Sequence, residues 1–464
     1  MFNTEQGFMD ALYGIYVNMG KSDLYGGTLQ TALDMTAQYY SYYDISECPY
    51  GHYQTFEYEH PSCTAISDAL WMRIYYCIGL TNNLLKYLDK PEAVQICSNY
   101  DYLRGEALAL RAYLHFELIR IFAPDVKKNP EYKSIPYRKT FSPDIEPQLK
   151  VKEVYQEILA DLTEAKQLLS NDVIRTNGPD WLGESEKKEE SDDVTDKNEG
   201  YYTSDFLKTR KYRMNYYAVL GTLARVHLTL GTTDDMEKAY DYAMEVIESG
   251  KFRPIQEEHI LVSGEQAKYR DILFTDEFIF GLYSAQVDAF YKSNFDESYG
   301  VKKILINKLS DIYGQGTRDL RQTHWFKTSW GTSYLLKHNA DLEYAKEKVR
   351  MITLAEMYYI AAEAHPAEAY DLLEEILPSR EIHSSLPVNA GRTEVLTEVL
   401  KEYRKEYIGD GQFFYAYKRL IEEEAAIHPL GINIPNENKV LVWPLPQDEI
   451  KYGDRESGIW KTEK

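Results

Sequence analysis

Apolar residues recur every three or four positions across residues 100–122, which read YDYLRGEALALRAYLHFELIRIF. These positions are Leu103, Ala107, Leu110, Leu114, Leu118 and Ile121. The spacing predicts an α-helix of about six turns with one apolar face, and Pro124 should end it. Arg111 lies in the same helix, and a charged side chain on a packed helix is normally paired. We therefore expect Arg111 to be a structural cation that faces a carboxylate of a neighbouring helix.

The same period returns along the chain and predicts further helices in pairs. Residues 217–250 form a helix–turn–helix unit of about 34 residues, the length of a tetratricopeptide repeat. Similar units can be drawn elsewhere, although their sequences differ too much for spacing alone to establish a repeat. The pattern favours a mainly α fold with four tetratricopeptide-like helix pairs, at approximately 101–169, 212–250, 349–377 and 394–424. Small strands complete the prediction, with a strand at 277–283 and a short extended run at 439–450.

Two segments break the helical period and are rich in aromatic residues. Residues 37–64 and 284–334 have no sustained apolar spacing, and irregular segments carry function more often than packed helices do. The chain contains 41 tyrosines, whose rings and hydroxyls suit contacts with sugars but also serve as core. We expect an irregular, loop-rich lobe beside the helix pairs.

Composition and charge narrow the function. The formal net charge of −22 would repel phosphate backbones, so nucleic acid is a poor partner. No run of eighteen apolar residues predicts a membrane span, and the first residues show no signal-peptide pattern. The cysteines are Cys48, Cys63, Cys77 and Cys97, without a CxxC pair or a neighbouring histidine cluster, which disfavours zinc. Cys48 and Cys63 could pair in an oxidising compartment, and free thiols are the alternative.

Metal and catalytic motifs are also missing from the sequence. The acidic loop 184–199 superficially suggests calcium, but the EF-hand spacing is not met, so a solvated insertion without metal is expected. No nucleophile elbow, HExxH, P-loop or dinucleotide motif occurs, so we expect no cofactor. Glu356 and Glu363 lie one heptad apart and could be read as a glycosidase pair. We expect them instead to pair with arginines such as Arg111 or Arg350.

Five stretches, in chain order, resemble motifs of the SusD/RagB family, the surface nutrient-binding lipoproteins of Bacteroidetes. They are W-x3-Y-x2-I-x3-N (Trp71, Tyr75, Ile78 and Asn82), RGEALALRAYLHFELIRIF (104–122), ITLAEMYYIAAEA (352–364), YRKEYIGDGQFFYAYKR (403–419) and WPLPQDEI (443–450). The chain departs from the family pattern in its long insertion at 171–211 and in lacking an Arg-rich continuation after residue 377. The resemblance implies a single SusD-like domain over residues 1–464.

The resemblance also implies a function. Such a protein would bind oligosaccharides without cleaving them and deliver them to a SusC-like TonB-dependent transporter. It would lie at the cell surface on the outer membrane, held by a lipid anchor that is not visible in this sequence. The alternatives are a peptide-binding lid of the RagB type, a glycoside hydrolase and a purely protein-binding scaffold.

We expect the ligand site where the two aromatic segments meet, because the resemblance places binding on corresponding loops. The candidates are Tyr39, Tyr40, Tyr42, Tyr43, Tyr50 and Tyr53 from the first segment, and Tyr291, Trp325, Trp330 and Tyr334 from the second. Trp325 and Trp330 are the best candidates, because a tryptophan outside the apolar face of a helix is less expected to belong to the core. The alternative is that these rings pack the loops onto the helices.

Overall fold

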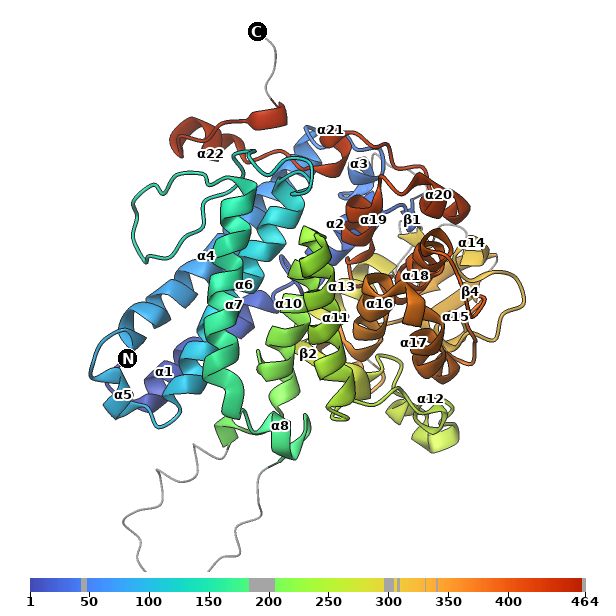
Figure 1. Ribbon diagram of the computed structural model, residues 1–464, viewed down its shortest axis with the longest axis horizontal. Helices are drawn as coiled ribbons and strands as arrows, with labels where there is room; N and C mark the ends of the chain where they lie inside the picture. Colours follow the sequence, from blue (N-terminus) through green and yellow to red (C-terminus); the bar gives the residue numbers. More distant parts are fainter. Residues whose placement is uncertain are drawn as a thin grey trace, which may run out of the picture.

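The computed structural model describes residues 1–42, 48–182, 205–295, 304–306, 309–329, 331–338 and 341–460. Its frame is a row of packed helices (Figure 1). The helices of the frame are α4 (Pro61–Leu88), α6 (Tyr100–Phe122), α7 (Val151–Leu168), α10 (Tyr216–Leu230), α11 (Thr233–Glu248), α16 (Leu354–Ala364), α17 (Ala369–Ile376), α18 (Arg392–Glu406) and α19 (Phe413–Leu420). In Figure 1, α6 and α7 stand to the left of α10 and α11, and α16, α17 and α18 follow on the right.

The helix pairs confirm the predicted mainly α fold. Helix α6 packs on α7, α10 on α11, α16 on α17, and α18 on α19, while α7 and α16 join neighbouring pairs by packing on α10 and α11. Gly231 ends α10 in the left-handed conformation, with φ +67°. The third pair differs at its start, because residues 348–353 form strand β6 rather than the beginning of α16.

Helix α6 is buried on every side from Gly105 to Phe122, so it is a core helix rather than an amphipathic one. Gly105 lets the end of α7 approach closely, since a Cβ at this position would lie 2.8 Å from the Leu169 side chain. Arg111 donates two hydrogen bonds to Asp161 of α7, at 2.7 and 2.8 Å, and a third to Asn82 of α4. Arg111 is thus the predicted structural cation, and it ties three helices together.

Short antiparallel strand pairs lie on the helical frame. Strand β1 (Tyr40–Ser41) pairs with β3 (Leu305–Ile306), and β4 (Phe326–Ser329) pairs with β5 (Thr332–Leu335). Strand β2 (Phe278–Tyr283) corresponds to the strand expected at 277–283, and it pairs with β6 (Lys348–Thr353), which runs directly into α16. The strands therefore attach the irregular segments to the third helix pair.

The remaining helices are short apart from those at the N-terminus. They are α1 (Glu5–Met19), α2 (Thr28–Thr36), α3 (Gly51–Gln54), α5 (Ala93–Ile96), α8 (Ile174–Asn177), α12 (Glu257–Ile260), α13 (Val287–Phe295), α14 (Leu309–Tyr313), α15 (Leu320–Trp325), α20 (Glu424–Ile427), α21 (Asn438–Leu441) and α22 (Gln447–Tyr452). The segments expected to be irregular thus contain α3 and α13–α15. The run expected to be extended at 439–450 is instead interrupted by α21 and α22.

Glu406 of α18 is the centre of a buried ion network. Its carboxylate accepts from Arg350 at 2.6 Å and from Arg321 at 2.9 Å, and Arg380 lies at 3.3 Å. Burial alone would raise the pKa of Glu406, but the three guanidinium charges hold it well below its usual value. The network fixes α18 against β6, α15 and the segment that follows α17.

All four cysteines are free and buried, and burial raises the pKa of Cys48 to about 11. No described helix has the length and apolar character that crossing a bilayer requires.

The acidic loop 184–199, where calcium was considered, lies outside the described residues. Within the described ranges, no group of three or more histidine, cysteine or acidic side chains is placed to hold a metal ion.

We predict that Arg111→Ala lowers the free energy of unfolding by about 3–5 kcal/mol, because Asp161 stays buried without its partner. The matched control is Arg104→Ala on the same helix, whose partners Asp89 and Glu164 are largely solvent-exposed. That change should cost only about 0–1 kcal/mol. Urea unfolding of both variants makes the comparison, and equal losses would contradict a structural role for the buried pair.

The second prediction concerns His115, which is buried and neutral. Its Nδ1–H donates to Arg111 O at 2.8 Å, and its Nε2 accepts from the Arg138 backbone N–H at 2.9 Å. Burial lowers its pKa from 6.5 to about 3. Because the folded pKa lies below the unfolded one, this contribution to stability is complete above pH 6.5 and is lost as the pH falls towards 3.

The variant His115→Gln keeps an acceptor for Arg138 but does not titrate. Its unfolding free energy, measured in urea between about pH 7 and pH 4, should fall less steeply than that of the wild type, by up to about 1.4 kcal/mol per pH unit. Parallel pH profiles for the two proteins would show that His115 does not carry this dependence.

Candidate functional site

The two aromatic segments lie side by side, as the sequence suggests. Strand β1 pairs with β3, and β3 packs on β5. The ring of Tyr40 lies 5.2 Å from that of Phe295, and the ring of Tyr50 lies 6.5 Å from that of Phe290. We call the junction the aromatic seam, and define it by the half-buried residues Tyr42, Phe290 and Tyr334 and by the buried Tyr50.

Most of the candidate tyrosines are core residues. Tyr39 donates to Arg404 O at 2.6 Å, Tyr40 to Asp34 at 2.9 Å, Tyr53 to Cys63 O at 3.0 Å, and Tyr291 to Gly409 O at 3.0 Å. Their rings are buried, so they present no face to a ligand in this structure. The interpretation that these rings pack the loops onto the helices therefore holds for them, because a buried hydroxyl needs a partner and each finds one.

Trp325 does not have the exposed indole that the sequence suggested. It is the last residue of α15 and is 0% exposed, and its indole N–H donates to Ile272 O at 2.6 Å. Lys337 Nζ lies 4.2 Å from the ring centroid, and the Arg350 guanidinium lies 5.3 Å away. Trp325 thus covers one side of the buried ion network. Trp330 and Tyr43, the other candidates, lie outside the described residues.

Two of the predicted candidates, Tyr42 and Tyr334, are half-buried. Tyr50 is buried, and its hydroxyl lies 3.3 Å from that of Thr28. The sequence reasoning missed Phe290, a half-buried ring that lies against Gly27. Gly27 has φ +147°, and a Cβ there would lie 2.1 Å from the Phe290 ring. The Gly26–Gly27 pair was the signal available in the sequence, since glycine permits such a close approach.

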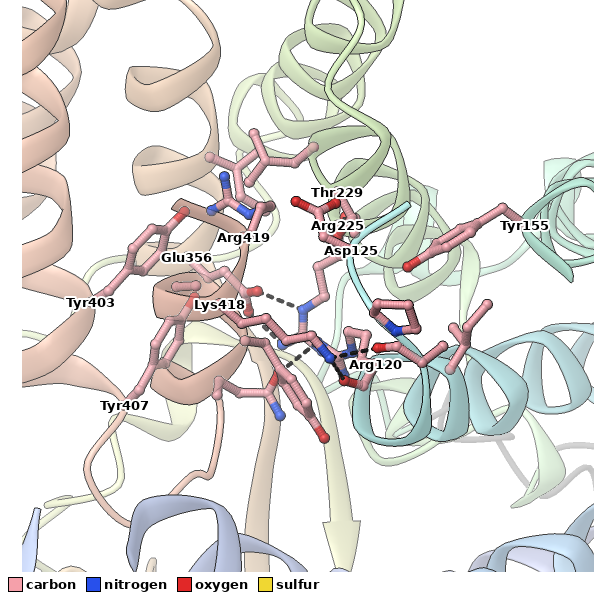
Figure 2. A pocket seen from close by; sticks show the side chains of 18 residues that line it. Arg120, Asp125, Tyr155, Arg225, Thr229, Glu356, Tyr403, Tyr407, Lys418 and Arg419 are labelled. Atoms are coloured by element: carbon pink, nitrogen blue, oxygen red, sulfur yellow. Dashed lines mark hydrogen bonds and ion pairs between the residues drawn. The ribbon is translucent and has the colours of Figure 1, made fainter. Parts of the chain in front are cut away.

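A pocket lies where the helix pairs converge (Figure 2). It has an empty volume of about 660 Å³, which includes open solvent at its mouth. Side chains from α6, α7, α10, α16, α18 and α19 line it, so every helix pair contributes. We call this the helix-pair pocket. Sequence periodicity could not find it, because its lining residues look like ordinary core positions of their separate helices.

Charged groups of this pocket are paired within the protein. Arg225 forms a bidentate pair with Glu356 at 2.5 and 2.6 Å. Arg419 forms a second pair with Glu363, including one contact at 2.8 Å. The two acids therefore pair with arginines, as expected, but with Arg225 and Arg419 in place of Arg111 or Arg350. Neither carboxylate is free to act as an acid or a nucleophile.

Lys418 also lines the pocket. Its ammonium group donates to Arg120 O at 2.8 Å and to Ala123 O at 2.7 Å, the unpaired carbonyls at the C-terminal end of α6. Burial lowers the pKa of Lys418 to about 7, while Asp125 acts in the opposite direction and Arg120 adds to the lowering. Lys418 thus satisfies the helix end where the chain turns away at Pro124.

Comparison with known proteins identifies the fold. A family model described as "Starch-binding associating with outer membrane" matches residues 15–178. A SusD superfamily protein from Bacteroides vulgatus is 21% identical with a TM-score of 0.70, covering 99% of this chain and 100% of its own. A SusD superfamily protein from Bacteroides thetaiotaomicron is 20% identical with a TM-score of 0.69, covering 97% and 98%.

A laminarin-binding SusD-like protein is also similar, at 18% identity and a TM-score of 0.65, and covers 99% of this chain and 100% of its own. No curated protein matches the sequence. The helix pairs and the attached strand pairs thus define a helical protein of the SusD fold along its whole length. The family model over residues 15–178 and the fold of these SusD superfamily structures agree with the resemblance carried by the motifs of this chain.

Proposed function

We propose that this protein binds oligosaccharides at the cell surface, as a single SusD-like domain over residues 1–464, and delivers them uncleaved to a SusC-like TonB-dependent transporter. The family description as starch-binding and the laminarin-binding relative support a carbohydrate ligand. The same family description supports association with the outer membrane. The observation that carries the proposal is the aromatic seam, because it brings half-buried aromatic residues from distant segments together.

The seam has the properties that sugar stacking requires. An aromatic face gains dispersion and hydrophobic contact with the C–H face of a sugar ring, and nearby hydroxyls orient the sugar. Phe290 is supported from behind by Gly27 and by the edge of Tyr50, so its ring is held before a ligand arrives. Such preorganisation reduces the entropy lost on binding. The Tyr50 hydroxyl lies 3.3 Å from the Thr28 hydroxyl.

The acids of the described chain argue against cleavage. A glycosidase needs two carboxyl groups that both reach the glycosidic bond. Glu356 and Glu363 are each held in an arginine pair. Burial raises the pKa of Asp34 to about 8, which would suit a general acid, but Asp34 is completely buried and accepts from the backbone of Gly409. It therefore holds a loop in place rather than facing a substrate.

We predict that Phe290→Ala and Tyr334→Ala each weaken oligosaccharide binding by about 1–3 kcal/mol, the scale of losing one buried aromatic contact. Isothermal titration calorimetry with laminarin- and starch-derived oligosaccharides measures this. The matched control is Tyr452→Ala, which removes a 64% exposed ring on α22, well away from the strands of the seam in Figure 1. It should leave affinity unchanged.

If both seam variants bind as tightly as the wild type while remaining folded, the site lies elsewhere. If no glycan binds but an extended peptide does, the RagB-type alternative replaces the glycan ligand.

We also predict that a bound oligosaccharide keeps its chain length during long incubation with the protein, because Glu356 and Glu363 are each held in an arginine pair. Chromatography of the recovered glycan gives the answer. Turnover that disappears in Glu356→Gln or Glu363→Gln would overturn the non-catalytic assignment.

A further inference from the structure

Three tyrosine hydroxyls of the helix-pair pocket have no hydrogen-bond partner in the described part of the chain. They belong to Tyr155, Tyr403 and Tyr407, whose residues are only 4%, 2% and 5% exposed. All three line the pocket, and in Figure 2 the Tyr155 hydroxyl points into it from the side opposite Tyr403 and Tyr407. Buried tyrosines elsewhere in this protein, such as Tyr39 and Tyr53, bond to the protein itself.

The three hydroxyl oxygens are not among the fully buried polar atoms that lack a partner, so they are reached from the open space of the pocket. Water or a ligand in the pocket can therefore bond to them. Arg120 adds a fourth group, since its buried Nε also lacks a partner among the described residues. Its other nitrogens bond Gln412 and Glu117, both at 3.1 Å. The pocket therefore offers several donors and acceptors that converge from different helices.

The charges around the pocket are balanced. The guanidinium groups of Arg120, Arg225 and Arg419 pair with Glu117, Glu356 and Glu363 respectively. Lys418 bonds two backbone carbonyls and lies near Asp125. A cation would thus find only carboxylates that are already paired, and an anion would meet only Lys418 outside an ion pair, whose ammonium group already donates to two backbone carbonyls. A neutral ligand with hydroxyl groups meets the free groups without this cost.

The walls between these polar groups are apolar. Ile119, Leu228 and Ile360 line the pocket together with Ala123 and Pro124. The rings of Tyr403 and Tyr407 are stacked with their centroids 5.1 Å apart. Hydroxyls set among C–H and ring surfaces match a sugar ring, which has polar edges and apolar faces. The empty volume of about 660 Å³, part of which is open solvent, leaves room for a sugar ring.

We propose that the helix-pair pocket is a second binding site, which takes one neutral sugar ring or a polyol of similar size. No residue of the seam lines this pocket, so the site is separate from the one assigned above and goes beyond the proposed function. Tyr155, Tyr403 and Tyr407 bind the ligand hydroxyls, and the aliphatic wall contacts its C–H face.

The test uses Tyr→Phe substitutions, which remove the hydroxyl and preserve the ring. Because these hydroxyls bond nothing in the protein, Tyr155→Phe, Tyr403→Phe and Tyr407→Phe should fold with unchanged melting temperatures. Binding of glucose, galactose and glycerol is followed by saturation-transfer NMR titration. We expect the wild type to bind at least one of them. Each variant should weaken that binding by about three- to tenfold, the worth of one hydrogen bond, and the triple variant by more.

Two controls separate this site from the seam. Phe290→Ala should leave monosaccharide binding unchanged, and the triple Tyr→Phe variant should leave oligosaccharide binding at the seam unchanged. Tyr76→Phe removes the hydroxyl of a 51% exposed tyrosine on α4 and should change neither.

The proposal is overturned if none of the three compounds binds the wild type, because the pocket then holds water only. It is also overturned if the triple variant binds them normally, or if acetate or inorganic phosphate competes for the same tyrosines. Loss of monosaccharide binding in Phe290→Ala alone would place the sugar at the seam instead. Calorimetry can disprove oligosaccharide binding at the seam while monosaccharide binding in the helix-pair pocket is still observed. The NMR titration can likewise disprove binding in the pocket while binding at the seam is still observed.

Discussion

The pairing of buried arginines with buried carboxylates from other segments is the constraint on which this fold depends. Arg210 bonds Asp172 at 2.6 Å and also Glu106 of α6, and Arg225 of α10 pairs with Glu356 of α16. Removing one partner of a fully buried pair typically costs about 3–5 kcal/mol. A helix packed in the wrong register would leave such charges unpaired, so the pairs select one arrangement of the helices in addition to the apolar contacts that favour association.

This constraint explains what the sequence could and could not predict. The apolar period predicts the helices because it depends only on residues close in the sequence. The position of Arg111 on a packed helix also correctly predicts that its charge is paired. The partner Asp161 lies 50 residues away and is decided by packing. The exposure of the aromatic rings could not be predicted for the same reason. Trp325 lies outside a long helical stripe, yet a buried network of distant charges beneath it determines its environment. Tyr39 and Tyr291 likewise bond backbone carbonyls that only the fold brings near.

The helix-pair pocket also could not be predicted from the local sequence. Tyr403 and Tyr407 are spaced four residues apart, which predicts one packed helix face, and their stacked rings agree with it. The direction of each hydroxyl depends on what the facing helices place opposite, and here they leave open space. A tyrosine can therefore serve as core through its ring while its hydroxyl stays available. The many tyrosines of this chain therefore serve mainly to pack its core, and few of them remain available to recognise a ligand.

Net charge connects the two candidate sites. A formal charge of −22 gives the surface a negative potential that disfavours anionic ligands over a distance of about one Debye length, roughly 8 Å at physiological ionic strength. The arginines of the helix-pair pocket do not offset this locally, because carboxylates already pair with them, and Lys418 donates to backbone carbonyls. What remains available is uncharged, namely ring faces at the seam and hydroxyls in the pocket. Both proposed sites should therefore favour neutral polyhydroxylated ligands over phosphorylated or acidic ones, for reasons that begin with how the buried charges hold the helices together.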